Sequence, residues 1–390
     1  MMKPIKDGDK IAQLCDEFCE RYFTEENIKQ WCESEGLPRR VYQDFYQIGL
    51  GKYVLPVIAG GVDVPFIDRA YMLERLTRHA GATLPIQTDM LTLALLGSMR
   101  RQSQIEIVED LFPKQDGTIL FSQAFTEPGA GSDTQAVQTV VSAEDGRLYL
   151  DGLKTFVSSG QFAPRALVLA RDPVCGQVDG GMSLWLVSLD LPGISTMPIK
   201  TIGQEMLCPA AVRFDHVLLD PMWQIQTEGK LSSMLKREFA LGRVLVCASS
   251  LGLAKAAMDD VLVHASTHKI KGRTLASLPQ IQEKIAHMEV KIRAMDSFVT
   301  QAALAVDERD VDDLTLKTTL MKSYVPQTAT EVASEGLQIF GGIGYTDETR
   351  VSRIWRDCRG NQIAQGTDEV MVHFISTTLV RQASHGILER

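Results

Sequence analysis

The sequence predicts an α+β protein that is mostly α-helical, and three changes of pattern along its 390 residues predict this class. From residue 8 to about 112, apolar residues recur at helical spacing. Short β-branched and aromatic runs begin after Gly117, and long apolar-faced helical patterns return after Leu231. We therefore expect an N-terminal helical domain (1–116), a central β domain (117–228) and a C-terminal four-helix bundle domain (229–390).

The first domain is expected to be helical throughout. "IAQLCDEFCERYF" and "DRAYMLERLTRHAG" place apolar residues at i, i+3, i+4 and i+7, and Gly81 suits the left-handed residue that ends many helices. "PIQTDMLTLALLGSMR" is apolar almost without interruption in its middle, which indicates a buried helix. This segment carries Asp89.

The second domain is expected to be built from six short strands, and the third from four long helices. The strand runs are "TILFSQAF", "QTVVSAE", "RLYLDGLKTFVSS", "RALVLAR", "MSLWLVSL" and "AAVRFDHVLL", and "AEDGRL" predicts a hairpin turn. The helical patterns are "REFALGRVLVCASSLGLAKAAMDDVLVHA", "LPQIQEKIAHMEVKIRAMDSFVTQAALAV", "LKTTLMKSYVPQTATEVASEGLQIFGG" and "TDEVMVHFISTTLVRQAS".

Composition argues against nucleic-acid binding, membrane binding and a metal site. A net charge of -9 argues against nucleic acid or an anionic membrane as the main partner. Seven cysteines without a C-x-x-C pair predict reduced thiols and a cytoplasmic location, and the histidines form no cluster with carboxylates that predicts a metal site. The N-terminus has no apolar signal segment, and no apolar run reaches the length we expect of a membrane span.

Three stretches carry the functional signal. In "FTEPGAGSDTQAVQT", a Gly-Ala-Gly-Ser turn after a strand exposes backbone N–H groups and hydroxyls, which suits a phosphate or a polar ring edge. The others are "KTFVSSG" and "LQIFGGIGYTDETRVSRIWRDCRGNQIAQGTDEV". Together they resemble the acyl-CoA dehydrogenase family of flavoproteins, in family order over nearly the whole chain. The resemblance implies FAD, an acyl-CoA substrate, and a homotetramer or dimer.

The resemblance also assigns residues to the flavin. Gln123, Phe125 and Thr126 would line the flavin edge, with Gly131 and Ser132 beside it, and Ser132 would also touch the CoA chain.

In "KTFVSSG", Phe156 stands where the family usually has a tryptophan, and Val157 and Ser158 would offer backbone and hydroxyl hydrogen bonds to the ring.

Further positions follow from the C-terminal signature. Gln338, Gly341 and Gly342 would meet the adenine end of FAD in a neighbouring subunit, and Thr367 and Glu369 the stretch from pyrophosphate to adenine.

One position on the first long helical pattern and one just after it complete this assignment. Arg243 matches a family arginine near CoA. His268 stands where relatives carry an arginine that reaches the flavin phosphates, and Lys269 or Lys271 can supply the lost charge as a point charge only.

The catalytic carboxylate of the family is absent from both of its usual positions. Gln365 stands where relatives carry the carboxylate that removes the Cα proton, and the second known position is Gly242. A neutral amide accepts no proton near pH 7, although the backbone N–H of Gln365 stays available to an enolate oxygen. Asp89 lies in the segment that forms the acyl-pocket floor in relatives, with helix capping as the alternative. Glu238 is expected on an exposed helix face.

Three hypotheses stay open at this point. The first is an FAD-dependent α,β-desaturation of an acyl-CoA, or the reverse reduction, with Asp89 as base and an electron-transfer flavoprotein as redox partner. The second is a non-redox elimination, which Gln365 and Gly242 favour. The third is a catalytically silent subunit of a heteromer.

Overall fold

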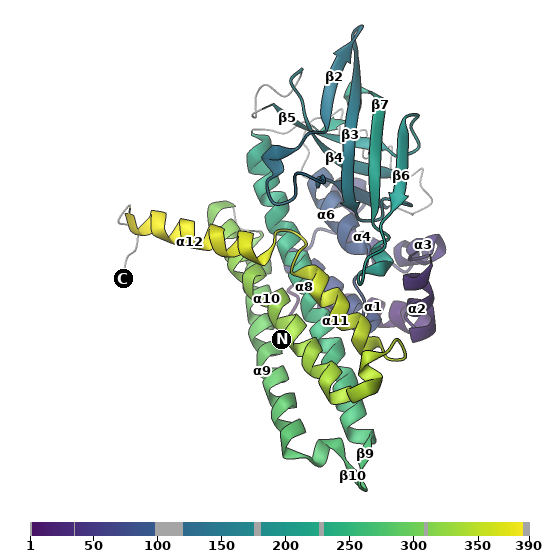
Figure 1. The fold of residues 1–390 in the computed structure, drawn as a ribbon, viewed down its shortest axis with the longest axis vertical. Coiled ribbons are helices and arrows are strands. Elements are labelled where there is room, and N and C mark those ends of the chain that lie inside the picture. Colours follow the sequence, from purple (N-terminus) through teal and green to yellow (C-terminus); the bar gives the residue numbers. More distant parts are fainter. Residues whose placement is uncertain are drawn as a thin grey trace. The chain divides into compact units, whose positions relative to one another are not determined.

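The computed structural model describes residues 2–34, 36–97, 120–174, 181–225, 230–307 and 311–384, and their packing forms two compact units (Figure 1). The helical unit comprises Met1–Lys29, Val64–Thr83 and Phe239–Arg390. The sheet unit comprises Gln30–Asp63 and Leu84–Glu238. The predicted class, with N-terminal helices, a central β-sheet domain and a C-terminal helical domain, is confirmed. The predicted boundaries at residues 116 and 228 lie outside the described residues.

Helices dominate the helical unit. They are α1 (Gly8–Tyr22), α5 (Phe66–Ala80), most of α8 (Leu231–Thr267), α9 (Pro279–Ala305), α10 (Val311–Phe340), α11 (Arg350–Asn361) and α12 (Asp368–Ser384), while α2 (Glu25–Glu33) is divided between the units. The four long helices expected from the sequence are α8, α9, α10 and α12; α11 is an additional helix within the third motif. Gly81 caps α5 as predicted, at φ 56°, and its N–H donates to the Thr77 carbonyl oxygen at 2.9 Å.

The expectation about apolar runs was wrong for α8. This helix is long and apolar enough to cross a membrane by length and composition. However, 89% of its most apolar 18-residue window is buried inside the protein, as expected of the core helix of a globular domain. The reason is that a helix surrounded by other elements is apolar on all faces.

A buried ion cluster joins three helices of the helical unit. Lys255 of α8 lies 3.1 Å from Glu74 of α5 and 2.9 Å from Asp296 of α9. All three side chains are less than 10% exposed. Because an isolated buried charge is costly, this cluster fixes the register of α8 against both neighbours.

The sheet unit contains an eight-stranded sheet together with α3 (Arg39–Gln47), α4 (Gly51–Val54) and α6 (Ile86–Gly97). The strands run in the order β6-β7-β3-β2-β4-β5-β8, and β1 pairs in parallel with β4. Their bounds are β1 (Phe121–Ala124), β2 (Val140–Glu144), β3 (Arg147–Val157), β4 (Arg165–Arg171), β5 (Met182–Ser188), β6 (Ile194–Pro198), β7 (Ala210–Leu219) and β8 (Gln224–Ile225). The predicted hairpin joins β2 to β3 through Asp145 and Gly146, both at positive φ. Strands β6 and β8 were not predicted.

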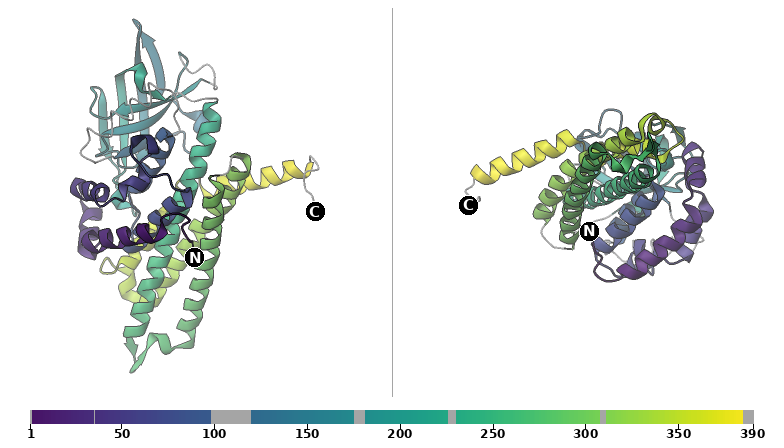
Figure 2. Two further views of the ribbon diagram at one scale, coloured as in Figure 1. Left: turned by 180° about the vertical axis from the view of Figure 1, so that it is seen from behind. Right: turned by 90° about the horizontal axis from the view of Figure 1, so that it is seen from below.

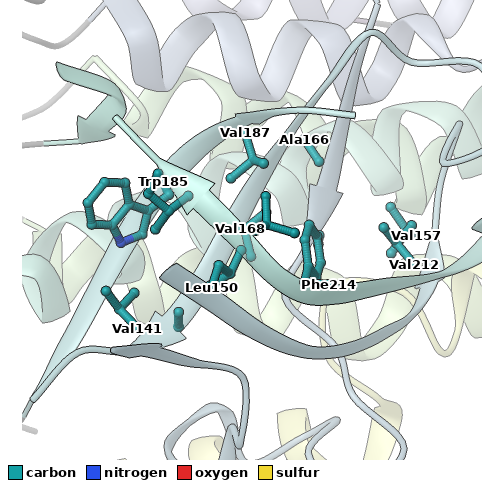
Figure 3. Packing of buried hydrophobic residues seen from close by; sticks show 13 residues of the cluster. Val141, Leu150, Val157, Ala166, Val168, Trp185, Val187, Val212 and Phe214 are labelled. Atoms are coloured by element: carbon teal, nitrogen blue, oxygen red, sulfur yellow. The ribbon is translucent and has the colours of Figure 1, made fainter. Parts of the chain in front are cut away.

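The core of the sheet unit lies on one face of this sheet (Figure 3). Val168 of β4, Trp185 of β5 and Phe214 of β7 are at most 2% exposed. On β7 the core residues alternate with exposed ones, whereas β4 and β5 are buried on both faces. A rigid sheet of this kind holds the ends of β1 and β3 in fixed positions, and the first two sequence motifs, "FTEPGAGSDTQAVQT" and "KTFVSSG", begin there.

Candidate active site

The first two motifs lie side by side in the sheet unit. Phe125 and Thr126 follow β1, and Lys154 and Thr155 are close to the end of β3. The Thr155 N–H donates to the Thr126 carbonyl oxygen at 2.9 Å, and the Lys154 ammonium donates to the Phe125 carbonyl oxygen at 3.1 Å. Two segments about 30 residues apart in the sequence are therefore joined by hydrogen bonds.

A buried ion pair holds the two motifs together. Lys154 Nζ lies 2.8 Å from Glu127 Oε1, and their side chains are 0% and 4% exposed. The Glu127 carboxylate also accepts the N–H groups of Gln138 at 2.6 Å and Thr139 at 2.9 Å. Burial by itself would raise the pKa of Glu127, but the hydrogen bonds from Lys154 and Thr139 bring it below its ordinary value. Both residues stand in the quoted motifs, so the sequence contained the signal although their pairing was not predicted.

Phe156 is the most unusual of the predicted flavin residues. Its ring is 62% exposed, and its backbone has φ 54°, which is rare for a residue with a bulky side chain. It lies in the register shift of the β3–β7 pairing between Lys154 and Val157. Such a shift turns a side chain away from its regular direction and is frequent at functional sites.

The other predicted flavin residues of the sheet unit differ in exposure. Gly131 and Ser132 are exposed, and four are half-buried: Gln123, Phe125, Thr126 and Ser158. Val157 is fully buried in the sheet core, so only its backbone can meet a ligand.

Asp89 is a buried residue of α6, at 2% exposure. Its Oδ1 accepts the N–H of Phe121, the first residue of β1, at 2.6 Å. Burial raises the pKa of Asp89 well above its ordinary value, and this hydrogen bond only partly opposes the effect. Asp89 therefore satisfies a buried backbone donor at the start of β1.

The expectation that Glu238 lies on an exposed helix face was wrong. Its side chain is 2% exposed, and its Oε1 accepts a hydrogen bond from Nε2 of Gln123 at 2.8 Å. Burial raises the pKa of Glu238 to about 8, although the hydrogen bond from Gln123 acts in the opposite direction. Its partner Gln123 belongs to β1, 115 residues earlier in the sequence, so no local pattern around Glu238 indicates this contact.

In the helical unit, Arg243 has few internal partners. Its Nη1 donates to Oγ1 of Thr319 at 3.0 Å, and its buried Nε has no hydrogen-bond partner among the described residues. Burial lowers the pKa of Arg243 to about 10, so it remains a cation at neutral pH. A half-buried guanidinium with an unused donor is suited to a carbonyl or anionic ligand.

The loop that carries Gln365 is held by a buried lysine that sequence reasoning missed. Lys322 of α10 is 0% exposed and donates to the carbonyl oxygens of Gly366 at 3.0 Å and Gln362 at 3.4 Å. Burial lowers the pKa of Lys322. Gln365 itself is half-buried and has φ 56°. The lysine thus stabilises a turn in which the backbone of Gln365 is left-handed.

The residues predicted to meet adenine and pyrophosphate lie on the surface of the helical unit. Gln338, Gly341, Gly342 and Glu369 are exposed, and Thr367 is half-buried. A polar hollow of about 400 Å³ is lined by Gln327, Thr330, Glu331, Ser334, Trp355, Gln362 and Asp368.

His268 is also exposed, and its ring stacks on His264 at 4.9 Å between centroids. His264 in turn stacks on Phe340 at 4.2 Å. Despite this pair of histidines four residues apart, no group of three His, Cys, Asp or Glu side chains gathers within the described ranges.

Comparisons with known proteins agree with this arrangement. Residues 122–217 match the middle domain of acyl-CoA dehydrogenases, and residues 231–380 match their C-terminal domain. The probable acyl-CoA dehydrogenase YdiO of Escherichia coli (strain K12) is 31% identical over 367 residues, 93% of each chain.

Solved structures show the same fold. The acyl-CoA dehydrogenase from Slackia heliotrinireducens is 35% identical, covers 98% of each chain and superposes with a TM-score of 0.83. The FADH2 complex of a glutaryl-CoA dehydrogenase from Mycobacterium smegmatis is 20% identical, covers 96% of this chain and 95% of its own, and has a TM-score of 0.82; this likeness concerns the fold alone. The protein belongs to the acyl-CoA dehydrogenase family and is an oxidoreductase of the acyl-CoA dehydrogenase type.

Proposed function

We propose that this protein binds FAD and catalyses α,β-desaturation of an acyl-CoA thioester, or the reverse reduction. The observation that carries the proposal is the joined pair of motifs in the sheet unit, where Thr155, bonded to Thr126, directly precedes the exposed ring of Phe156. A planar, amphipathic ring system with polar edges suits such a surface. When bound, FAD supplies the oxidant that accepts a hydride from Cβ of the acyl group.

The chain's own residues would bind and orient the substrate. Arg243 would neutralise part of the CoA moiety, with Ser132 along its chain. The backbone N–H of Gln365, in the turn held by Lys322, would donate to the thioester oxygen as negative charge develops there. The family resemblance suggested Asp89 as the base, but its carboxyl group is buried and bound by the Phe121 N–H.

Two observations support a homo-oligomer and a cytoplasmic location. Helix α12 buries only Met371 within its own chain and exposes Val372 and Val380, and Figure 2 shows it extending away from α10. This exposed apolar surface supports a homo-oligomer, a tetramer or dimer. The thiols of Cys15, Cys19, Cys247 and Cys358 are free, which supports a cytoplasmic location. An electron-transfer flavoprotein is the proposed redox partner.

The experiment that tests the proposal is an anaerobic titration of the purified protein with short, branched and cyclic acyl-CoAs, followed by its visible spectrum. Bleaching of the flavin band by one of them is the expected result. A yellow protein that turns over a thioester without bleaching would instead identify the elimination reaction that Gln365 favours. A protein that purifies without flavin would contradict the proposal and support the silent-subunit hypothesis.

Phe156→Gly is expected to weaken FAD binding about tenfold without loss of fold stability. Glycine relieves the left-handed backbone at φ 54°, which offsets the cost of its greater freedom in the unfolded chain, while the exposed ring is lost. FAD titration of the apoprotein and thermal unfolding measure the two effects. Unchanged FAD affinity would remove Phe156 from the site.

Arg243→Met is expected to raise KM for the acyl-CoA by about 30-fold or more, because a half-buried cation that binds one ligand charge contributes about 2 kcal/mol or more. Arg243→Lys retains the charge but not the planar donor fork, so an intermediate KM is expected. Steady-state kinetics with the substrate found in the titration check this. An equal KM in Arg243→Met and wild type would separate Arg243 from substrate binding.

A further inference from the structure

The desaturation proposed above needs a carboxylate that neither family position provides. Gln365 is an amide and Gly242 has no side chain. The proton on Cα of a thioester is weakly acidic, so its removal requires a base close to the reacting carbon. Two of the buried carboxyl groups in the sheet unit, Asp89 and Glu238, each have a single, neutral hydrogen-bond partner among the described residues.

The two carboxyl groups differ in how they are held. Asp89 has a short side chain, and a backbone N–H binds its Oδ1 at 2.6 Å, so its position is tied to the start of β1. Glu238 has a longer side chain, and its one hydrogen-bond partner among the described residues is the side-chain amide of Gln123 at 2.8 Å. A side-chain partner can move with the carboxyl group, whereas the backbone of a strand cannot.

Gln123 also links Glu238 to the residues expected to line the flavin edge. It is half-buried at the third position of β1, and the family resemblance assigns it to the flavin edge. Gln123 is the one polar group that acts on the ionisation of Glu238 within the described chain, and no charged side chain does so. At pH 7, a carboxyl group with a pKa of about 8 is ionised in about a tenth of molecules, and its carboxylate is a much stronger base than an exposed one.

We propose that Glu238 is the catalytic base that removes the Cα proton of the acyl thioester; this assignment rests on the proposed function. The Cα–H bond breaks, and its proton bonds to a carboxylate oxygen of Glu238. The electron pair left on Cα forms the Cα=Cβ double bond as a hydride leaves Cβ for bound FAD, the two-electron oxidant. In the reverse direction, protonated Glu238 returns the proton to Cα.

The test is exchange of the substrate's Cα protons in D₂O under anaerobic conditions, measured by mass spectrometry with an acyl-CoA that bleaches the wild-type flavin. Glu238→Gln is expected to lower the exchange rate by about 10²–10⁴-fold. In wild type the rate should rise with pH through about 8, because only the ionised group accepts a proton, and Glu238→Gln should lose this rise. Asp259→Asn is a matched control, since Asp259 lies on the same helix in a surface pair with Arg78.

A rescue variant keeps the test independent of folding. The double variant Glu238→Gln with Gln365→Glu supplies a carboxylate at the usual family position, and it should regain exchange with a different pH profile. FAD content and acyl-CoA binding by calorimetry should match wild type in Glu238→Gln. Exchange at the wild-type rate in Glu238→Gln would overturn the assignment. If exchange were lost in Asp89→Asn and retained in Glu238→Gln, the base would be Asp89 instead. If wild type itself neither exchanges nor bleaches with any acyl-CoA, the proposed function fails first, and this inference with it.

Discussion

Replacing Lys154 with methionine is expected to lower the free energy of unfolding by about 3–5 kcal/mol. The substitution retains much of the side-chain volume but leaves the Glu127 carboxylate, 4% exposed, without its cation. It also removes the ammonium that donates to the Phe125 carbonyl oxygen, so the two flavin motifs lose a direct link. Denaturant titration followed by tryptophan fluorescence measures the change, since Trp185 lies in the core of the same unit.

Two comparisons make the Lys154 result specific. Lys291→Met breaks the half-exposed pair with Glu331 and should cost only about 0.2–1 kcal/mol. Adding Glu127→Gln to Lys154→Met should cost less than the sum of the single variants, because the uncompensated buried charge is then absent. Strict additivity of the two substitutions would show that the pair does not act as a unit.

Glu238→Gln is expected to become more stable relative to wild type by about 3–5 kcal/mol between pH 5 and pH 9. The folded-state pKa of Glu238, about 8, exceeds the ordinary glutamate value of 4.5. The folded protein therefore holds a proton that the unfolded chain has released, and the wild type loses stability as pH rises from about 4.5 to about 8. Glutamine does not titrate and retains a hydrogen-bond partner for Gln123, so this loss is absent from the variant.

Denaturant titrations of both proteins at pH 5, 7 and 9 check this prediction, and other titrating groups cancel in the difference. Asp259→Asn should show no comparable trend, because its side chain is 40% exposed. A difference that stays constant across this range would contradict the burial of Glu238 as a titrating carboxyl group. A catalytic base whose removal stabilises the fold is an example of the trade-off between stability and activity at active sites.

The sequence by itself determined most of the architecture. Short β-branched and aromatic runs predicted β1 to β5 and β7, the helical period predicted α8 to α10 and α12, and Asp145-Gly146 predicted the hairpin turn. These features depend on local patterns, which neighbouring residues set. Strand β6 was not predicted because its residues are mostly exposed and do not alternate between buried and exposed positions. The amide at Gln365 was also evident from the sequence, since it is a change of residue type within a specific motif.

Only the tertiary structure decided which carboxyl groups are buried. Glu238 follows two basic residues and resembles a solvated helical position, yet a strand 115 residues away covers it and supplies its partner. The pairing of Glu127 with Lys154 likewise joins two motifs that the sequence keeps apart. Desolvation depends on all the atoms that surround a group, from any part of the chain. For this reason residue types could be read from the sequence, whereas the ionisation that their chemistry requires could not.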